Sequence, residues 1–235
     1  MGSDQPGAVL LERDGALSTL DAAFGAVVAG RGQVALVSGE AGIGKSSLVR
    51  AFVASERRAA RVLAGACDDL AVPRPLGPFL DIAGELPGLA AELRTTGADA
   101  TRSVLDVLRR DGPTICIVED AHWADEATID VLAFVARRVE GVPALLVVSF
   151  RDDEVGPDHP LRRALAAAPA GHTHRLELER LSVEAIGRLA GARSTRRPCA
   201  RSRAATRSSS ARHWRAAGVG SRRACATRSS PGPRG

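Results

Sequence analysis

The sequence predicts an α/β fold in which helices cover a parallel β-sheet, and three observations support this class. Short apolar runs bounded by turn residues recur along the chain, which is typical of strands buried on both faces. Stretches of helical character separate these runs. The 235 residues are 45% hydrophobic but include only five Phe, two Trp and no Tyr, so aliphatic side chains must build the core.

Five parallel strands are expected, at residues 33–39, 61–67, 114–120, 143–150 and 174–180. Helices are expected at residues 45–60, 98–110, 126–139, 159–167 and 182–191. For helix 126–139, Asp125 is a suitable N-cap and Glu126 suits the positive end of the helix dipole. One apolar face of this helix consists of Ile129, Leu132, Ala136 and Val139. The segment 68–78 is assigned as a loop because it is rich in proline.

The positive charge of the chain is concentrated near its C-terminus. The formal net charge is +5, yet the last acidic residue is Glu184, and residues 193–234 contain 12 arginines and no carboxylate. The rest of the chain has 20 basic and 27 acidic side chains, so it is acidic. We therefore divide the chain into a folded domain at 1–192 and a disordered arginine-rich tail at 193–235.

The four cysteines show no metal-ligand spacing; two lie in predicted strands and two in the tail, and they are interpreted as buried thiols of a cytoplasmic protein. The N-terminus lacks the basic and apolar regions of a secretory signal. No apolar run approaches the roughly 20 residues that a membrane-spanning helix needs. A soluble, cytoplasmic chain without a membrane partner is therefore expected.

A phosphate-binding motif follows the first predicted strand. Residues 39–46 match G-x-x-x-x-G-K-[ST] between a strand and a helix, the context that this P-loop requires. Its glycines let backbone N–H groups point at phosphate oxygens, and the helix N-terminus attracts the same anion. The expected nucleotide contacts are Gly39, Glu40, Ala41, Gly42, Ile43, Gly44, Lys45, Ser46 and Ser47.

Lys45 is the single lysine in a chain with 31 arginines. A compact ammonium fits the phosphate-binding loop, whereas a guanidinium fork is too bulky for it. Lys45 is therefore expected to reach the β- and γ-phosphates, and the Ser46 hydroxyl is expected to ligate Mg²⁺.

Two carboxylates end the third predicted strand, in the sequence ICIVED. Glu119 and Asp120 therefore lie at the carboxyl edge of the sheet, where open α/β folds bind ligands. In a phosphoryl-transfer site one carboxylate holds Mg²⁺ and the next polarises the attacking water. By position Glu119 is the metal partner and Asp120 the catalytic base. Because the first position usually carries Asp, metal binding by Asp120 is kept as an alternative.

ATP is favoured over GTP as the ligand. Predicted strand 61–67 separates the P-loop strand from the carboxylate strand, an insertion typical of P-loop ATPases with an additional strand. The N/T-K-x-D guanine motif is excluded because the chain has no second lysine. The expected cofactors are ATP and Mg²⁺, and the domain at 1–192 is therefore predicted to be a P-loop ATPase domain.

Arg151 follows the fourth predicted strand. A strand-end arginine beside the γ-phosphate would sense that group or stabilise charge in the transition state, which would make Arg151 catalytic together with Lys45 and Asp120. The alternative is an ion pair with Asp152 or Asp153 in a solvated loop. His122 and Trp123 are expected to pack and orient the loop after the carboxylates.

An ordered set of segments resembles the ATPase domain of large ATP-binding LuxR-type transcriptional regulators, in the origin-recognition-complex-like AAA and STAND groups. The set comprises LLERDGALSTL, VSGEAGIGKSSLV, IVEDAHWAD, LLVVSFRDDE, HPLRRAL and LELERLSVEAI, and covers about residues 9–191. The resemblance implies an ATP-driven switch with slow hydrolysis; self-association through this domain is left open. The family carries a Gly-Arg pair near the adenine pocket, where this chain has Glu12 and Arg13, so Arg13 is an expected nucleotide contact.

The tail suggests that the chain is truncated by a frameshift near residues 191–193. SRAATRSSS and SRRACATRSSPG can each be encoded so that one shifted frame reads TGGNPFFV and VPPSVRDAVLAR, strings similar to that family. The lid, sensor and DNA-binding regions of a full regulator would then be missing, and DNA binding is not expected from this chain. The alternatives are a nucleotide-binding fragment without hydrolysis and a nucleic-acid-binding protein acting through its arginine-rich tail.

Overall fold

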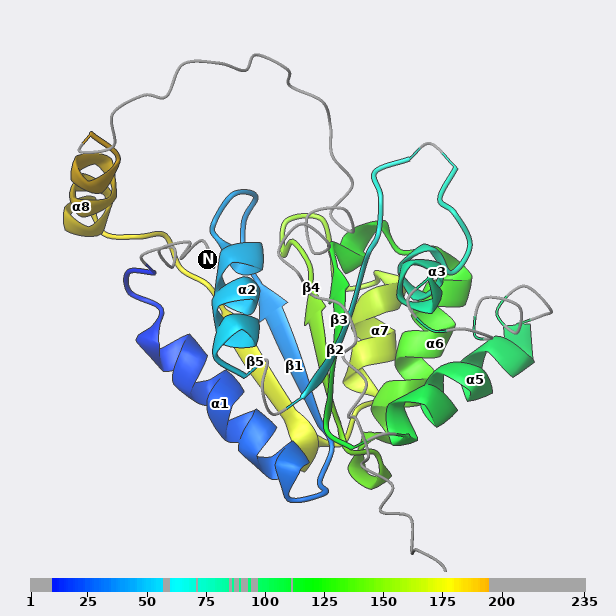
Figure 1. Cartoon of the computed structure of the whole chain (residues 1–235). Helices are drawn as coiled ribbons and strands as arrows, with labels where there is room; N and C mark the ends of the chain where they lie inside the picture. Colours follow the sequence, from blue (N-terminus) through cyan, green and yellow to red (C-terminus); the bar gives the residue numbers. More distant parts are fainter. Residues whose placement is uncertain are drawn as a thin grey trace, which may run out of the picture.

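A computed structural model of the chain describes residues 10–194 except 57–59, 71, 85, 87–88, 90–92, 94–96 and 111. In this part, a five-stranded parallel sheet lies between two layers of helices (Figure 1). The predicted α/β class is therefore confirmed. The segment from residue 195 onward, with Cys199 and Cys225, lies outside the described residues. The division of the chain at residue 192 and the frameshift consequently stay predictions.

All five predicted strands are present, as β1 (Gln33–Ser38), β2 (Arg61–Ala66), β3 (Thr114–Glu119), β4 (Ala144–Ser149) and β5 (Thr173–Glu177). Their order across the sheet is β2-β3-β4-β1-β5, and every neighbouring pair is parallel. In space the strand between β1 and β3 is β4. The strand that intervenes between them along the chain, β2, lies at the sheet edge beside β3.

The helices of the described residues are α1 (Asp14–Val28), α2 (Lys45–Glu56), α3 (Gly77–Ala83), α5 (Gly97–Arg109), α6 (Glu126–Arg137), α7 (Pro160–Ala166) and α8 (Val183–Ser194). Short 3₁₀ turns lie at Ala121–Trp123, Val139–Gly141 and Ala170–His172. Helices α2, α5, α6, α7 and α8 correspond to the five that the sequence predicts. The prediction that all of 68–78 is loop is wrong at its end, where α3 begins at Gly77.

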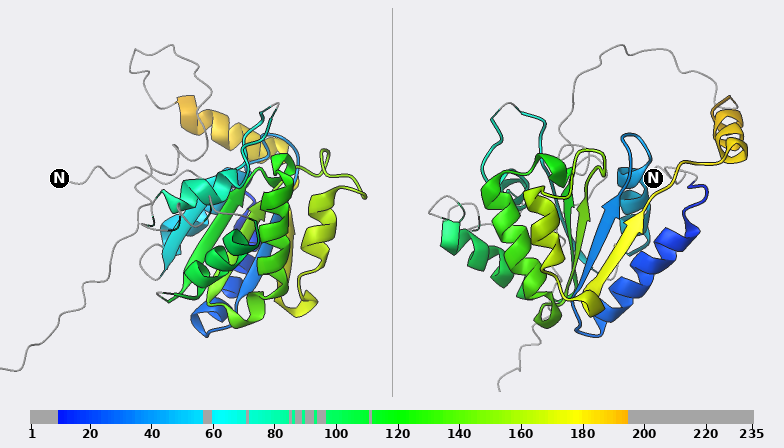
Figure 2. Two further views of the ribbon diagram at one scale, coloured as in Figure 1. Left: turned by 90° about the vertical axis from the view of Figure 1, so that its right-hand side faces the viewer. Right: turned by 180° about the vertical axis from the view of Figure 1, so that it is seen from behind.

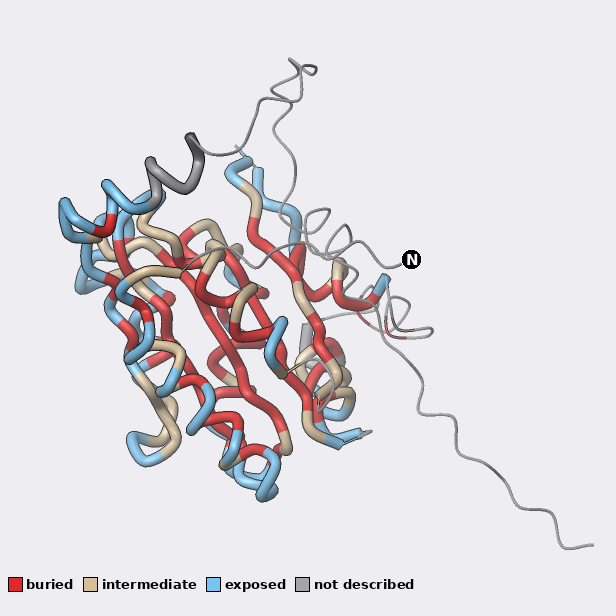
Figure 3. Tube along the Cα trace, turned by 60° about the vertical axis from the view of Figure 1, so that its left-hand side comes forward, coloured by how far each residue is buried: buried red, intermediate tan, exposed pale blue. Residues whose placement is uncertain are grey.

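The two helical layers cover opposite faces of the sheet (Figures 1 and 2). Alternate residues of the central strands point to each side, so Val37, Ile117 and Val147 pack with α1 and α2, and Leu36, Val118 and Val148 pack with the other layer. The tube in Figure 3 is therefore red along the inner strands. This two-sided burial explains why the strands read as continuous apolar runs.

Helix α6 forms as the sequence predicts. The Asp125 carboxylate accepts hydrogen bonds from the backbone N–H groups of Ala127 (3.1 Å) and Thr128 (3.4 Å) at its N-terminus. The four residues of the predicted apolar face are all buried. The helix thus anchors the short turn that leads out of β3.

The described cysteines, Cys67 and Cys116, are buried free thiols. Burial raises the pKa of each to about 12, so neither forms a reactive thiolate at neutral pH. The interpretation of these two as buried thiols is confirmed.

Gly65 of β2 lies directly against α3. A Cβ atom at this position would be 2.0 Å from the Pro78 carbonyl oxygen. Because the clash is with backbone, Gly65→Ala is expected to lower the free energy of unfolding by about 2 kcal/mol. The control is Gly25→Ala in α1, where an added Cβ meets nothing within 4 Å and alanine favours the helix. Chemical denaturation compares the two; an unchanged stability for Gly65→Ala would contradict this packing.

Residues 178–182 lead from β5 to α8, which lies apart from both helical layers in the views of Figure 1 and Figure 2, right. On α8, the side chains of Val183 and Ile186 are exposed. None of the described helices is long and apolar enough to cross a membrane.

Candidate functional site

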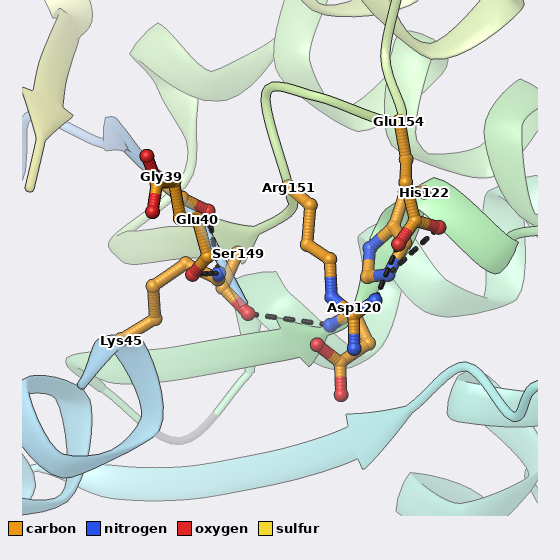
Figure 4. A network of polar contacts seen from close by, with 8 residues as sticks. All are labelled: Gly39, Glu40, Lys45, Asp120, His122, Ser149, Arg151 and Glu154. Carbon is orange, nitrogen blue, oxygen red and sulfur yellow. Dashed lines mark hydrogen bonds and ion pairs between the residues drawn. The ribbon is translucent and has the colours of Figure 1, made fainter. Parts of the chain in front are cut away.

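Three connections leave the carboxyl ends of neighbouring strands, so they lie close together at that end of the sheet. The phosphate-binding loop follows β1, Asp120 follows β3 and Arg151 follows β4. Because the strands are parallel and adjacent, side chains from these three places converge (Figure 4). The structure thus brings together Lys45, Asp120 and Arg151, which the sequence places up to about a hundred residues apart.

The loop between β1 and α2 has the backbone that its glycines permit. Gly39 and Gly44 adopt φ angles of 141° and 105°, which residues other than glycine rarely adopt. A Cβ at Gly39 would also lie 2.9 Å from the Leu178 carbonyl oxygen. Helix α2 begins immediately afterwards at Lys45, so its first N–H groups face the loop. This is the arrangement that cradles phosphate at a helix N-terminus.

The Lys45 side chain is folded into this loop. It is buried, and its Nζ donates hydrogen bonds to the carbonyl oxygens of Gly39 (2.7 Å) and Glu40 (2.9 Å). Burial lowers the pKa of the ammonium, and the negative charge of Asp120 opposes that shift. The loop therefore holds a single, compact positive charge at the place where the sequence predicts phosphate binding.

The two carboxylates at the end of β3, Glu119 and the following Asp120, have different surroundings. Glu119 is 3% exposed, and strand alternation puts it on the face of Ile115 and Ile117, which α2 covers. The first turn of α2 carries Ser46. Asp120 is more exposed and has left-handed backbone angles of φ 54° and ψ 42°. Glu119 therefore lies on the face of the sheet that is covered by α2, the helix that carries Ser46. Asp120 lies at the carboxyl end of the sheet, where the backbone turns out of β3.

Ser149 is a site residue that the sequence interpretation missed. It ends β4, is 1% exposed, and its Oγ accepts a hydrogen bond of 3.2 Å from the Asp120 backbone N–H. This bond fixes the left-handed turn at Asp120 relative to β4. The available signal was a polar residue at the end of an otherwise apolar strand.

The donor set suits Mg²⁺ bound together with a nucleotide. The described residues contain no cluster of three or more His, Cys, Asp or Glu that would hold a metal by itself. Ser46, Glu119 and Asp120 provide one hydroxyl and two carboxylates. Mg²⁺ commonly binds through one or two carboxylates plus substrate phosphates, so these residues fit the metal only with phosphate oxygens present.

Residues 9–148, more than half of the chain, match the AAA ATPase domain. The chain belongs to the AAA ATPase domain family. Its motifs and its sheet are therefore those of a P-loop ATPase fold.

Solved structures similar to this AAA ATPase domain include the ORC1 protein of Aeropyrum pernix in complex with DNA, with a TM-score of 0.55 and 15% identity over 79% of this chain and 50% of that chain. Drosophila ORC bound to DNA has a TM-score of 0.54 and 15% identity over 77% and 46%. An uncharacterized protein of Rhizobium meliloti (strain 1021) is 26% identical over 246 residues, which cover 79% of this chain and 24% of that protein. The chain thus spans at most half the length of these relatives. The structural likeness shows a shared fold.

Arg151 of the AAA ATPase domain pairs with a carboxylate other than those expected. Its guanidinium contacts Glu154 rather than Asp152 or Asp153. Its Cζ also lies 4.9 Å from the centre of the Trp123 ring, within the range of a cation–π contact. The alternative that Arg151 forms an ion pair within its own loop is therefore confirmed, but the partner is Glu154 and not Asp152 or Asp153.

His122 and Trp123 pack together beside Arg151, as the sequence predicts, with ring centres 4.4 Å apart. The His122 side chain is fully buried, and its Nε2 lies 3.6 Å from Glu154 Oε2. Burial lowers the pKa of His122, so the ring is neutral at pH 7. Glu154 consequently has Arg151 on one side and a neutral imidazole on the other (Figure 4).

Arg13 links three segments of the domain instead of projecting into open space. It is 6% exposed and donates hydrogen bonds to the carbonyl oxygens of Glu12 (2.9 Å), Ile43 (3.2 Å) and Glu179 (2.7 Å). The start of α1 is thereby tied to the phosphate-binding loop and to the segment after β5. Its contact with the adenine side of a nucleotide stays a prediction.

Two interactions at the surface join the same segments as the hydrogen bonds of Arg13. Glu40 accepts hydrogen bonds from Arg180 Nε (2.9 Å) and from its terminal nitrogen (2.6 Å), and Glu12 accepts one from the Ser182 backbone N–H (2.8 Å). The hydrogen bonds from the Ser182 hydroxyl and then from its backbone N–H lower the pKa of Glu12, and the hydrogen bond to Glu40 raises the pKa of Arg180. The phosphate-binding loop is therefore connected to the segment that leads into α8.

Proposed function

We propose that this AAA ATPase domain binds ATP with Mg²⁺ at the junction of the phosphate-binding loop, β3 and β4, and hydrolyses it slowly as a conformational switch. The observation that carries this proposal is the convergence of Lys45, Asp120 and Arg151 beside a glycine-rich loop that opens a helix. A buried ammonium, a helix N-terminus and an arginine favour a polyphosphate anion at this place.

Each residue has a distinct role in the proposed reaction. Lys45 and the loop N–H groups hold the β- and γ-phosphates, and Ser46 with Glu119 holds Mg²⁺, which supplies positive charge against the phosphate oxygens when bound. Asp120 polarises and orients the attacking water. Arg151 contacts the γ-phosphate and stabilises the charge that develops on it.

We further propose that the domain serves as the switch of a cytoplasmic regulator of the LuxR type. The resemblance of the motif set supports this context, and so does the length of the Rhizobium meliloti relative, of which the chain spans 24%. The links from the phosphate-binding loop to residues 179–182 give the nucleotide site a route to α8. Self-association through the domain belongs to the same proposal.

The test is titration calorimetry with ATP and ADP in the presence and absence of Mg²⁺, combined with a phosphate-release assay. Binding of ATP that strengthens with Mg²⁺, followed by slow release above background, is expected. Binding without release would select the non-hydrolysing module. A folded protein without ATP affinity would contradict the proposal, and salt-sensitive retention of nucleic acid by such a protein would favour the arginine-rich tail as the functional element.

A further inference from the structure

Strand β5 forms one edge of the sheet, and among the described residues it pairs only with β1 (Figure 2, right). Just after β5, the Leu178 N–H donates a 2.9 Å hydrogen bond to the carbonyl oxygen of Ser38 in β1. Successive residues of a strand direct their backbone N–H and C=O groups to alternate sides. The backbone groups of Arg175 and Glu177 therefore point away from β1, where no described segment bonds to them. This stretch is a free edge, the kind of surface that pairs with another strand.

The side chains of Arg175 and Glu177 lie on the sheet face that α7 covers. Between them in the sequence, Leu176 is buried against the other face, with α1 and α2. Arg175 and Glu177 are exposed and line a cavity of about 310 Å³, together with Leu36 of β1 and Leu165 of α7. Within the described part of the chain, neither side chain has an ion-pair or hydrogen-bond partner. The free edge thus carries one unpaired positive and one unpaired negative charge on the same face.

We propose that this edge is the contact between two copies of the chain, whose β5 strands pair antiparallel about a two-fold axis at Leu176. In this register Arg175 lies opposite the partner's Glu177, and Glu177 lies opposite the partner's Arg175, so each charge gains an opposite neighbour. Because both residues direct their backbone groups outward, each facing pair exchanges N–H and C=O bonds as an antiparallel ladder requires. The inference rests on the self-association included in the proposed function and gives it a surface.

The charge pattern selects this register among the antiparallel alternatives. An axis at Arg175 would set two guanidinium groups opposite each other, and an axis at Glu177 would set two carboxylates opposite each other. The free edge ends at Glu179, whose outward carbonyl oxygen accepts a 2.7 Å hydrogen bond from Arg13. Charges on an edge strand ordinarily discourage pairing with other strands. Here their opposite signs disfavour misaligned strands and favour a second copy in one alignment.

The proposed contact is separate from the nucleotide site. Neither the phosphate-binding loop nor Asp120 or Arg151 belongs to the edge strand, so the pairing needs no nucleotide. The ion pairs across the edge are exposed, and such pairs are individually weak. A short strand contact with exposed charges suits a dimer in equilibrium with the monomer rather than a permanent one.

Sedimentation velocity of the full chain without nucleotide tests this pairing. The parent is expected to shift from monomer to dimer as its concentration rises. Arg175→Glu and Glu177→Arg each turn both attractive pairs into repulsive ones, so each should weaken dimerisation by about tenfold. The matched control is Arg163→Glu, which makes the same charge change at an exposed position of α7 and should leave dimerisation unchanged. Thermal unfolding checks that each variant is folded.

A mixture of the two single variants gives the sharpest result. The Arg175→Glu chain has carboxylates at both positions and the Glu177→Arg chain has guanidinium groups at both, so the two chains should form a heterodimer as readily as the parent dimerises. The double variant should also dimerise like the parent.

Three results would overturn this inference: a parent that stays monomeric, a dimer that neither single variant weakens, or a mixture that stays monomeric. Titration calorimetry with ATP separates these from a failure of the proposed ATP binding. If ATP still binds, the nucleotide chemistry stands without this contact. A parent that dimerises through the edge but binds no ATP would remove that chemistry and leave this inference in place.

Discussion

Replacing Lys45 with alanine is expected to lower ATP affinity by at least about 100-fold. The ammonium is the only cationic side chain of residues 39–46, and charge-assisted hydrogen bonds contribute roughly 1.5–3 kcal/mol each. Loss of two such contacts to phosphates corresponds to two or more decades of affinity, at about 1.4 kcal/mol per decade. Titration calorimetry with ATP and Mg²⁺ measures the loss.

Two further variants separate charge from shape. Lys45→Arg keeps the positive charge and should still lose most of the affinity, because the guanidinium does not fit where Nζ lies 2.7 Å from the Gly39 carbonyl oxygen. Arg50→Ala removes one positive charge from the same helix and should change affinity by less than about threefold. Thermal unfolding of each variant checks that the loop remains folded. Wild-type ATP affinity in Lys45→Ala would contradict the assignment of the loop.

The sheet is predictable from the sequence because buried parallel strands leave an unmistakable pattern. Ile115 and Ile117 point to one face of the sheet and Val118 points to the other, and all three are apolar and buried. The apolar run ends at Glu119, where polar residues begin. The two helices that were not predicted, α1 and α3, lack such clear signals at their boundaries. Helix α1 has no side-chain N-cap and contains two glycines, and α3 begins among prolines. Proline in the first turn of a helix costs nothing, since that N–H has no intrahelical partner.

The site is predictable only as far as local motifs extend. Residues 39–46 and the strand-end carboxylates can be read from spacing alone. The sequence does not reveal that Arg151 pairs with Glu154 instead of its immediate neighbours, because a turn of the backbone decides which carboxylate it faces. Nor does it reveal the bonds of Arg13 to Ile43 and Glu179, 30 and 166 residues away. Such contacts arise from the packing of distant segments.

The adjacent carboxylates Glu119 and Asp120 should give opposite results when each is replaced by its amide. Asp120→Asn is expected to keep ATP affinity within about threefold and to slow phosphate release by at least about 100-fold, as expected for loss of a general base. Asparagine tolerates the left-handed backbone of this position, and the hydrogen bond from its N–H to Ser149 is unaffected. Glu119→Gln is expected to weaken the dependence of ATP binding on Mg²⁺, because a metal ligand is lost.

Phosphate release and Mg²⁺ titrations on both variants decide which carboxylate does which task. Asp153→Asn, which removes a charge from the exposed loop after β4, controls for long-range electrostatics. If Asp120→Asn instead alters the Mg²⁺ dependence and Glu119→Gln leaves it unchanged, Asp120 is the metal partner. That outcome would reverse the roles inferred from chain position. The burial of Glu119 would explain such a reversal, because a side chain that is only 3% exposed would be too enclosed to contact a hydrated ion.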